Sequence, residues 1–227
     1  MGGEATAAVI STGDELVPLG EHLRPGQIYD SNAFFLRAML VNCGATVQMV
    51  EHCPDDEGRL VDVFKRGAQN SVMVVSGGVS VGEHDLVKSA LSRIGATLDI
   101  WRVAIKPGKP FLYGRVAGCR VFGLPGNPVS SFVTFLKFVR PAVLKMMGAA
   151  DEELGLPVLP ARLAESVEGD RHRPHYIRGK LANGEFRPVG RQESHAVFGL
   201  SRANALLRVP PETQFDAGDV VEVEVWE

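Results

Sequence analysis

Residues 72–85 read Val-Met-Val-Val-Ser-Gly-Gly-Val-Ser-Val-Gly-Glu-His-Asp, a short apolar run followed at once by a loop with three glycines. The apolar run predicts a buried strand over residues 72–76, and Asp85 is expected to open a helix that stops near Gly95. Glycines let the backbone turn sharply and expose N–H groups, and a helix starting just beyond them favours a bound anion. The alternative is a tight strand-to-helix turn in which Asp85 only caps the helix, and the loop alone does not decide between them.

Three further loops have the same character. Residues 11–16 read S-T-G-D-E-L, residues 106–110 read K-P-G-K-P, and residues 123–131 read G-L-P-G-N-P-V-S-S. Each follows a predicted strand, and each mixes glycine or proline with polar side chains that a simple connector does not need. Ligands of open α/β sheets collect at the carboxyl ends of strands, so four such loops predict a binding site for a phosphorylated ligand. The 72–85 stretch is neither a Walker loop nor a dinucleotide fingerprint.

The chain divides by pattern into residues 1–150 and residues 151–227. In the first part short apolar strands alternate with amphipathic helices, which predicts an α/β three-layer sandwich around a mostly parallel sheet. The second part has short alternating segments separated by turn residues, including a hairpin signal at Asn183-Gly184, and predicts a small all-β module. The expected strands of the first part cover residues 7–11, 46–51, 72–76, 100–105, 111–114 and 120–122.

Helix-capping residues mark where the predicted helices begin. Ser31 or Asn32 can cap a helix over residues 33–41, and Asp55 or Asp56 can cap one over residues 58–68. Asn127 is expected to cap a long helix that has Pro128 in its first turn and runs toward Gly148. Pro141 lies inside that helix and should kink it, because proline lacks the N–H that the helix needs there.

Composition and charge exclude several classes of protein. The chain has 227 residues, 45% of them hydrophobic, and a formal net charge of −3. This balance gives no general affinity for nucleic acid or for anionic membranes, and no run of about 18 apolar residues predicts a membrane span. Its three cysteines, Cys43, Cys53 and Cys119, form no C-x-x-C pair, which favours buried free thiols in a reducing, cytoplasmic compartment over a disulfide framework or a zinc site.

Taken together, the four loops and the Y-D-S-N stretch at residues 29–32 resemble the molybdopterin molybdenumtransferase (MoeA) family, whose eukaryotic relative is the E domain of gephyrin. The motifs occur in the family's order over residues 9–131, and residues 157–227 match more loosely. The resemblance implies a molybdopterin-binding α/β domain over residues 1–150 and a β-barrel-like domain over residues 151–227. It also implies a role in molybdenum cofactor biosynthesis, with transfer of molybdenum from molybdate to adenylated molybdopterin and release of AMP.

The same resemblance implies catalytic residues and a Mg²⁺ requirement. The matching catalytic positions are Glu15, Asp55, Asp85 and Lys106, and Glu15 and Asp85 match positions that hold magnesium near the phosphates. Carboxylate oxygens suit a hard cation, although Asp55 and Asp85 could equally be plain helix caps. Glu15 has no such structural role in the sequence, because it lies among small and polar residues just after a strand.

Binding of the oxyanion and the pterin is implied at further positions. Lys106 and Lys109 lie in a stretch stiffened by two prolines, which fixes their directions. With them, Arg178 and Ser194 of the β module match the family's molybdate-binding residues. The positions that match its molybdopterin- and nucleotide-binding residues are Thr12, Gly13, Asp14, Ser76, Gly77, Gly78, Ser80, Gly82, Pro125, Gly126, Asn127 and Ser130.

The resemblance further implies a homodimer, with a molybdopterin adenylyltransferase as the partner in the pathway. Family members normally carry two more domains before the S-T-G-D-E-L strand, and these supply active-site groups to the partner subunit. We therefore expect this chain to fold and bind adenylated molybdopterin but to insert molybdenum poorly. The alternative is a non-catalytic pterin-binding or scaffold module.

Overall fold

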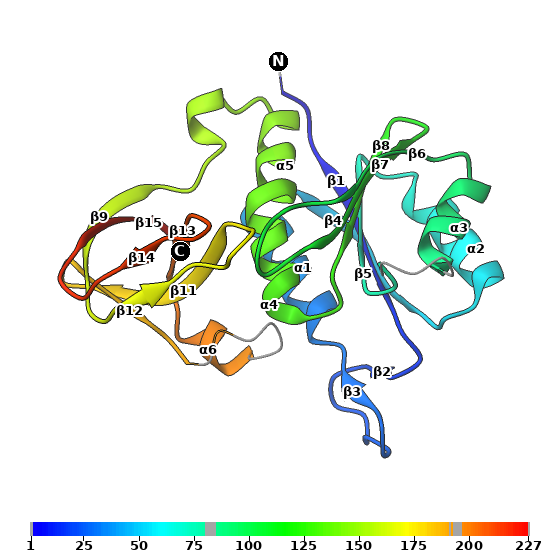
Figure 1. Ribbon diagram of the computed structural model, residues 1–227. Coiled ribbons are helices and arrows are strands. Elements are labelled where there is room, and N and C mark those ends of the chain that lie inside the picture. Colours follow the sequence, from blue (N-terminus) through cyan, green and yellow to red (C-terminus); the bar gives the residue numbers. More distant parts are fainter. Residues whose placement is uncertain (1, 80–84, 191, 193–196, 227) are drawn as a thin grey trace.

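A six-stranded sheet with helices on both faces forms the centre of the structure, a computed structural model that describes residues 2–79, 85–190, 192 and 197–226. A closed barrel of five short strands lies against one side of this α/β part (Figure 1). The predicted three-layer α/β architecture with a following β module is therefore confirmed. The division placed between residues 150 and 151 stays a prediction.

The sheet has the strand order β4-β1-β5-β8-β7-β6. The first four strands are mutually parallel, whereas β7 and β6 continue the sheet as antiparallel neighbours. Strand β5 lies inside the sheet and all five of its residues are buried, as expected for an apolar run covered on both faces. The strands are β1 (Thr6–Thr12), β4 (Thr46–Cys53), β5 (Val72–Ser76), β6 (Thr97–Arg102), β7 (Pro110–Val116) and β8 (Cys119–Leu124).

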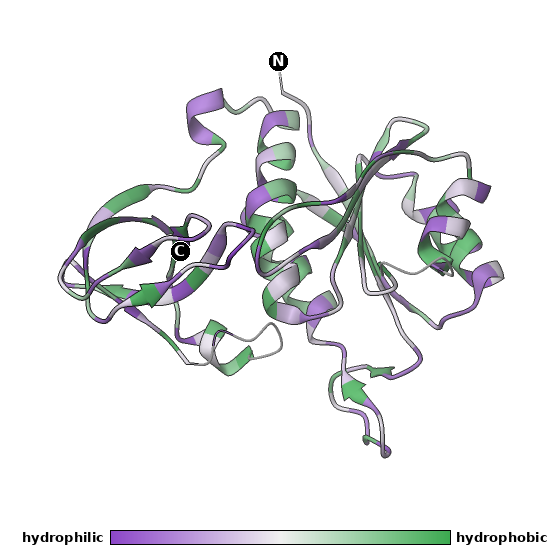
Figure 2. Ribbon diagram, viewed as in Figure 1, coloured by the Kyte–Doolittle hydropathy of each residue, from purple (hydrophilic) through white to green (hydrophobic). Residues whose placement is uncertain are grey.

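Two apolar layers hold helices against the sheet. On one face, α1 (Ser31–Asn42) and the long helix over residues 128–146 pack on alternate residues of the strands. Leu36, Leu40 and Phe135 are fully buried there. On the other face lie α2 (Glu57–Gly67) and α3 (Leu86–Arg93). In Figure 2 the central strands are largely hydrophobic, whereas the acidic turn η2 (Asp151–Glu153) is hydrophilic.

The long helix after the 123–131 loop is not regular. It runs as α4 (Pro128–Thr134), a π-helical segment η1 (Phe135–Val139) and α5 (Arg140–Met146). Pro141 has no N–H to donate and its ring would clash with the carbonyl four residues earlier, and a wider π turn just before it relieves both problems. The helix thus continues through η1 into α5, and Pro141 does not end it.

Two of the expected caps need correction or refinement. The N-cap of α1 is Asp30, whose carboxylate accepts a hydrogen bond from the Ala33 amide at 3.0 Å, and neither Ser31 nor Asn32 has that position. Asp56 caps α2, as one of the two predicted alternatives. Asp85 caps α3 through the Lys88 amide at 2.9 Å, as predicted.

The barrel closes in the order β11-β12-β9-β15-β13 around its own apolar core. Asn183 and Gly184 have positive φ angles and form the predicted hairpin turn between β11 and β12. The sequence patterns predicted an all-β module, but the module also contains a short helix. Its elements are β9 (Val158–Leu163), β10 (Val167–Glu168), β11 (His175–Ala182), β12 (Glu185–Pro188), α6 (Val197–Ser201), β13 (Ala205–Val209), β14 (Gln214–Phe215) and β15 (Val220–Val225).

Strands β2 (Leu16–Val17) and β3 (Ile28–Tyr29) pair beyond the end of β1 and extend from the α/β part (Figure 1). All three cysteines are free, and burial raises the pKa of the Cys119 thiol to about 12, so it stays protonated. Within the described part of the chain no helix is both long and apolar enough to cross a bilayer.

Candidate functional site

Three parallel strands end side by side and bring their loops together. In the pairing register Ser11 of β1 lies opposite Ser76 of β5, which lies opposite Leu124 of β8. The loops that follow these strands surround a hollow of about 710 Å³. Residues from the S-T-G-D-E-L, Y-D-S-N, glycine and G-L-P-G-N-P loops all line it, so the sheet gathers segments that are far apart in the sequence.

The glycine loop approaches the end of β1 more closely than any side chain would allow. Gly77 and Gly78 both have positive φ angles, and the Gly77 amide donates to the Leu124 carbonyl at 3.2 Å. A Cβ atom on Gly77 would lie closer than 3.0 Å to the backbone oxygen of Thr12, and one on Gly78 equally close to the Thr12 hydroxyl. Glycine is therefore required here both by backbone angle and by space.

Asn32 joins three walls of the hollow, a role that its position in the sequence does not predict. Its side-chain amide donates to the Ser76 hydroxyl at 2.8 Å and to the Gly126 carbonyl at 2.7 Å. The side chain is buried, so these bonds fix the start of α1 against the ends of β5 and β8. Asp30 adds a second tie, because its carboxylate accepts from the Ser11 hydroxyl. The Y-D-S-N motif was the available signal, but the partners of Asn32 lie 44 and 94 residues away.

Acidic side chains gather at one mouth of the hollow. Glu15 and Asp55 both line it, and the Asp55 amide donates to the Asp14 carboxylate at 3.0 Å. Partial removal from water, followed by the negative charges of Asp14 and Glu15, raises the pKa of Asp55. His52 contacts the same loop, with its ring Nε2 2.8 Å from the Gly13 carbonyl oxygen. Two of the predicted catalytic carboxylates thus share one surface, and both residues are exposed to solvent.

Some of the other residues predicted to bind the pterin line the hollow and some do not. Thr12, Gly13, Ser76, Gly77, Gly78, Pro125, Gly126 and Asn127 line the hollow. Ser130 is buried in the first turn of α4 and Asp14 is exposed, and neither of them lines the hollow. Asp85 is buried at the start of α3 and does not line it. Ser80 and Gly82 lie outside the described residues.

The loop that carries Lys106 is attached to the barrel by backbone hydrogen bonds. The Lys106 amide donates to the Pro174 carbonyl at 2.9 Å, and the Tyr176 amide donates to the Lys106 carbonyl at 2.7 Å. This pairing sets Lys106 opposite His175 on β11, three residues before Arg178. Lys109 is exposed at the far end of the same loop.

Arg178 lies on the outward face of β11, beside the α/β part. Tyr176, two residues earlier, packs with Phe132 of α4, and side chains two apart on a strand share a face. The Arg178 side chain is 2% exposed, and its guanidinium lies so close to Gly199 of α6 that a Cβ there would be 3.2 Å from Nε. Ser194, the other predicted molybdate ligand of the β module, lies outside the described residues.

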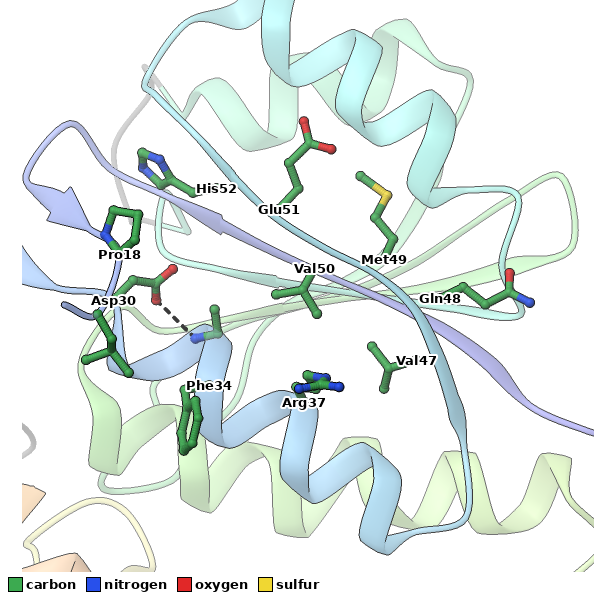
Figure 3. Close-up of a pocket in the computed structure, with 12 residues that line it drawn as sticks. Pro18, Asp30, Phe34, Arg37, Val47, Gln48, Met49, Val50, Glu51 and His52 are labelled. Atoms are coloured by element: carbon green, nitrogen blue, oxygen red, sulfur yellow. Dashed lines mark hydrogen bonds between the residues drawn. The ribbon is translucent and has the colours of Figure 1, made fainter. Parts of the chain in front are cut away.

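A second hollow of about 560 Å³ lies over the edge strand β4 and the side of α1 (Figure 3). Phe34, Val50 and Arg37 line it, and Asp30 belongs to both hollows. It contains none of the glycine-loop residues, and most of its lining comes from the continuous surfaces of α1 and β4. We place the candidate site in the hollow at the strand ends for this reason.

His175, opposite Lys106, gives the domain interface a pH-dependent stability. Burial, and then the positive charges of Lys106 and Arg173, lowers the pKa of His175 from 6.5 to about 4. Between those values the unfolded chain binds a proton that the folded chain does not. The free energy of unfolding should therefore fall by about 2 kcal/mol as the pH drops from 6.5 to 4, at 1.36 kcal/mol per pKa unit reduced for solvent screening.

Urea unfolding at several pH values measures this effect in the wild type and in His175→Gln. The variant lacks the titrating ring, so the difference between the two free-energy curves isolates the contribution of His175 from that of the carboxylates. We expect the wild type to lose more stability than the variant between pH 6.5 and 4. Parallel curves over that range would contradict the prediction.

Comparison with known families gives two matches that together cover most of the chain. Residues 8–145 match the family described as "probable molybdopterin binding domain", and residues 160–226 match the MoeA C-terminal region (domain IV). The first match spans the sheet and the loops around the candidate site, and the second spans the barrel.

Individual relatives agree with these matches. A protein named molybdopterin molybdenumtransferase from Haemophilus influenzae is 35% identical over 95% of this chain and 55% of its own length. The molybdenum cofactor synthesis protein cinnamon of Drosophila melanogaster is 35% identical over 91% of this chain and 35% of its own. The crystal structure of a molybdopterin biosynthesis MoeA protein from Pyrococcus horikosii superposes with a TM-score of 0.86 at 32% identity, covering 99% of this chain and 55% of that one. The chain thus spans about half the length of the bacterial and archaeal relatives.

Proposed function

The chain belongs to the molybdopterin molybdenumtransferase family, and from this premise we propose that it binds adenylated molybdopterin and molybdate and takes part in molybdenum insertion with release of AMP. The observation that carries the proposal is the hollow of about 710 Å³ at the ends of β1, β5 and β8. Its walls are the loops on which the resemblance to the family rests. The proposal includes a place in molybdenum cofactor biosynthesis, in the cytoplasm, after a molybdopterin adenylyltransferase.

The pterin and its phosphates would be held in this hollow by the glycine loop and by the N-terminal end of α4. Backbone N–H groups at the start of a helix favour anions, and Gly126 and Asn127 precede that helix. Gly77 and Gly78 let the glycine loop lie directly against the end of β1, and Asn32 keeps the three loops in register. The proposed contribution of these residues is to bind and orient.

Molybdate would be held across the boundary between the α/β part and the barrel. Lys106 and Lys109 lie on one side of it and Arg178 on the other, with Ser194 expected from the sequence. The pairing of Lys106 with β11 supports this arrangement, because it brings the lysine loop onto the strand that carries Arg178. A dianion needs donors from several directions, and the charged donors would neutralise it while it approaches the dithiolene. A family homodimer would supply any further groups.

The acidic residues that line the hollow are suited to bind Mg²⁺ together with phosphate oxygens of the substrate. Among the described residues no three histidine, cysteine or acidic side chains are arranged to hold a metal ion. Mg²⁺ is, however, commonly bound by only one or two carboxylates together with phosphate oxygens of a substrate. Glu15 would supply one carboxylate beside the bound phosphates, with Asp55 as a neighbouring acid. Asp85, the second predicted ligand, is buried at the start of α3 and does not line the hollow, so its proposed part in Mg²⁺ binding rests on the family resemblance. A bound Mg²⁺ would neutralise charge on the phosphate oxygens as AMP leaves.

AMP release from adenylated molybdopterin tests the proposed function. The purified chain is incubated with the nucleotide in Mg²⁺ buffer, with and without molybdate, and AMP is quantified by chromatography. We expect stoichiometric binding of the adenylated pterin and AMP release that increases with molybdate. Binding without any molybdate-dependent release would favour a pterin-binding module instead, and absence of binding would refute the proposal.

Asp85→Asn separates the metal role from the helix-cap role. Asparagine caps helices about as well as aspartate, so the melting temperature should change little. Removing the carboxylate deletes a hard ligand and leaves the glycine-loop amides in place, so Mg²⁺-dependent turnover should fall at least tenfold while pterin affinity stays within about twofold.

Asp56→Asn is the matched control, because Asp56 caps α2 in the same way that Asp85 caps α3. The control should keep wild-type turnover. Equal losses of turnover and pterin affinity in Asp85→Asn, or a fall in melting temperature that accounts for both, would return Asp85 to the role of a cap.

A further inference from the structure

One carboxylate lies between two cations at the predicted oxyanion site. Oδ2 of Asp170 is 3.4 Å from Nζ of Lys106 and 3.5 Å from Nη2 of Arg173. Its other oxygen accepts a hydrogen bond from the His172 amide at 3.1 Å. The two cations therefore converge on a single anionic group that the chain itself provides.

The cluster is built into the contact between the lysine loop and the barrel. Arg173 also donates to the carbonyl of Ile105, the residue before Lys106, at 3.3 Å. Asp170 and Arg173 come from the segment between β10 and β11, whereas Lys106 comes from the loop before β7. The His172 amide, and then the charges of Arg173 and Lys106, hold the pKa of Asp170 down at about 2. Its carboxylate is thus ionised throughout the range in which the protein would work.

We propose that Asp170 is an internal competitor of the oxyanion, occupying Lys106 and Arg173 until a dianion displaces it, and that Arg173 is a further oxyanion-binding residue. The proposal rests on the proposed function, since it takes Lys106 as part of the molybdate site. An oxyanion and a carboxylate both accept charge-assisted hydrogen bonds, which these two cations donate.

Charge decides the direction of the effect. An oxyanion hydrogen-bonded to Lys106 would lie within about 7 Å of Asp170, from the 3.4 Å ion pair and a hydrogen bond of about 3 Å. At that separation a dianion and a carboxylate repel each other appreciably even in water. The opposing benefit, a lysine held in place by a partly exposed ion pair, is small. Removing the carboxylate should therefore strengthen oxyanion binding.

Asp170→Asn in the full 227-residue chain tests the proposal by calorimetric titration with molybdate and, separately, with sulfate. The matched control is Glu224→Gln. Glu224 pairs with Lys137 at 2.6 Å, also links the barrel to the α/β part, and is 19% exposed against 17% for Asp170. We expect Asp170→Asn to bind both dianions at least fivefold more tightly than the wild type, and Glu224→Gln to bind them unchanged. Adding Arg173→Gln to Asp170→Asn should remove most of the gain.

Each outcome decides a different point. Unchanged or weaker binding by Asp170→Asn, including no binding of either dianion, would overturn the competitor role. If the double variant Asp170→Asn, Arg173→Gln keeps the full gain in dianion affinity, Arg173 is not part of the oxyanion site. The titrations contain no pterin, so they are independent of the AMP-release assay. A wild type that shows no pterin binding and no AMP release, while Asp170→Asn still gains affinity for both dianions, would refute the proposed function and leave this inference standing.

Discussion

Gly77→Ala is expected to abolish binding of adenylated molybdopterin and to lower the free energy of unfolding by about 3 kcal/mol. Gly77 has a φ of +89°, which disfavours any residue with a Cβ. The added methyl would also meet the backbone oxygen of Thr12, which is paired with Cys53 of β4 and directly follows Ser11, itself paired with β5, so this oxygen cannot easily move. The glycine loop must then shift away from β1, and the wall of the hollow shifts with it.

Gly118→Ala separates the backbone strain from the loss of the site. Gly118 has nearly the same φ, +88°, but a Cβ there would meet nothing within 4 Å. It lies in the turn between β7 and β8, between Val116 and Cys119. We expect this variant to lose about 1 kcal/mol and to bind the pterin normally. Equal binding by both variants, measured by fluorescence titration of the pterin, would show that the glycine loop is not part of the site.

Arg178→Ala is expected to raise the molybdate concentration for half-maximal insertion by roughly tenfold to a hundredfold, while pterin affinity stays nearly unchanged. A charged hydrogen bond contributes about 1.5 to 3 kcal/mol, and 1.4 kcal/mol corresponds to a factor of ten. Arg178→Lys keeps the charge but loses the planar fork of donors, so it should fall between the wild type and alanine.

Two further measurements distinguish a direct effect on molybdate binding from an effect on folding. Because Arg178 is buried, the melting temperature of each variant must be recorded beside its molybdate affinity. Arg187→Ala removes the same charge from an exposed arginine of the barrel, paired only with Glu185 among the ion pairs of the described residues, and should leave molybdate affinity unchanged. Unaltered molybdate binding in a folded Arg178→Ala would remove Arg178 from the oxyanion site.

Local sequence patterns were sufficient for much of the α/β part. The apolar run at residues 72–76 became β5 with the predicted bounds, because a strand buried on both faces has no polar positions to obscure it. The alternation of strands and helices likewise predicted a mostly parallel sheet, and β4, β1, β5 and β8 are parallel to one another. Asp85 became a helix cap because its hydrogen bond to Lys88 spans only three residues.

Long-range contacts explain what the patterns missed. Asp30, Ser31 and Asn32 are all residue types that can cap a helix. The sequence does not reveal that the Asn32 side chain instead donates hydrogen bonds to Ser76 and Gly126. The attachment of Lys106 to β11, and the position of Asp170 beside it, depend on how the barrel packs against the sheet. No local periodicity records such packing, so Asp170 and Arg173 carried no functional signal.

A crystal structure of the chain with bound adenylated molybdopterin would locate the phosphates relative to the glycine loop and α4. We predict that the phosphates lie between the glycine loop at Gly77 and Gly78 and the start of α4 at Gly126 and Asn127, within hydrogen-bonding distance of their backbone amides. Density for the ligand over β4 and α1, in the hollow lined by Phe34, or no ligand at saturating concentration, would contradict the account.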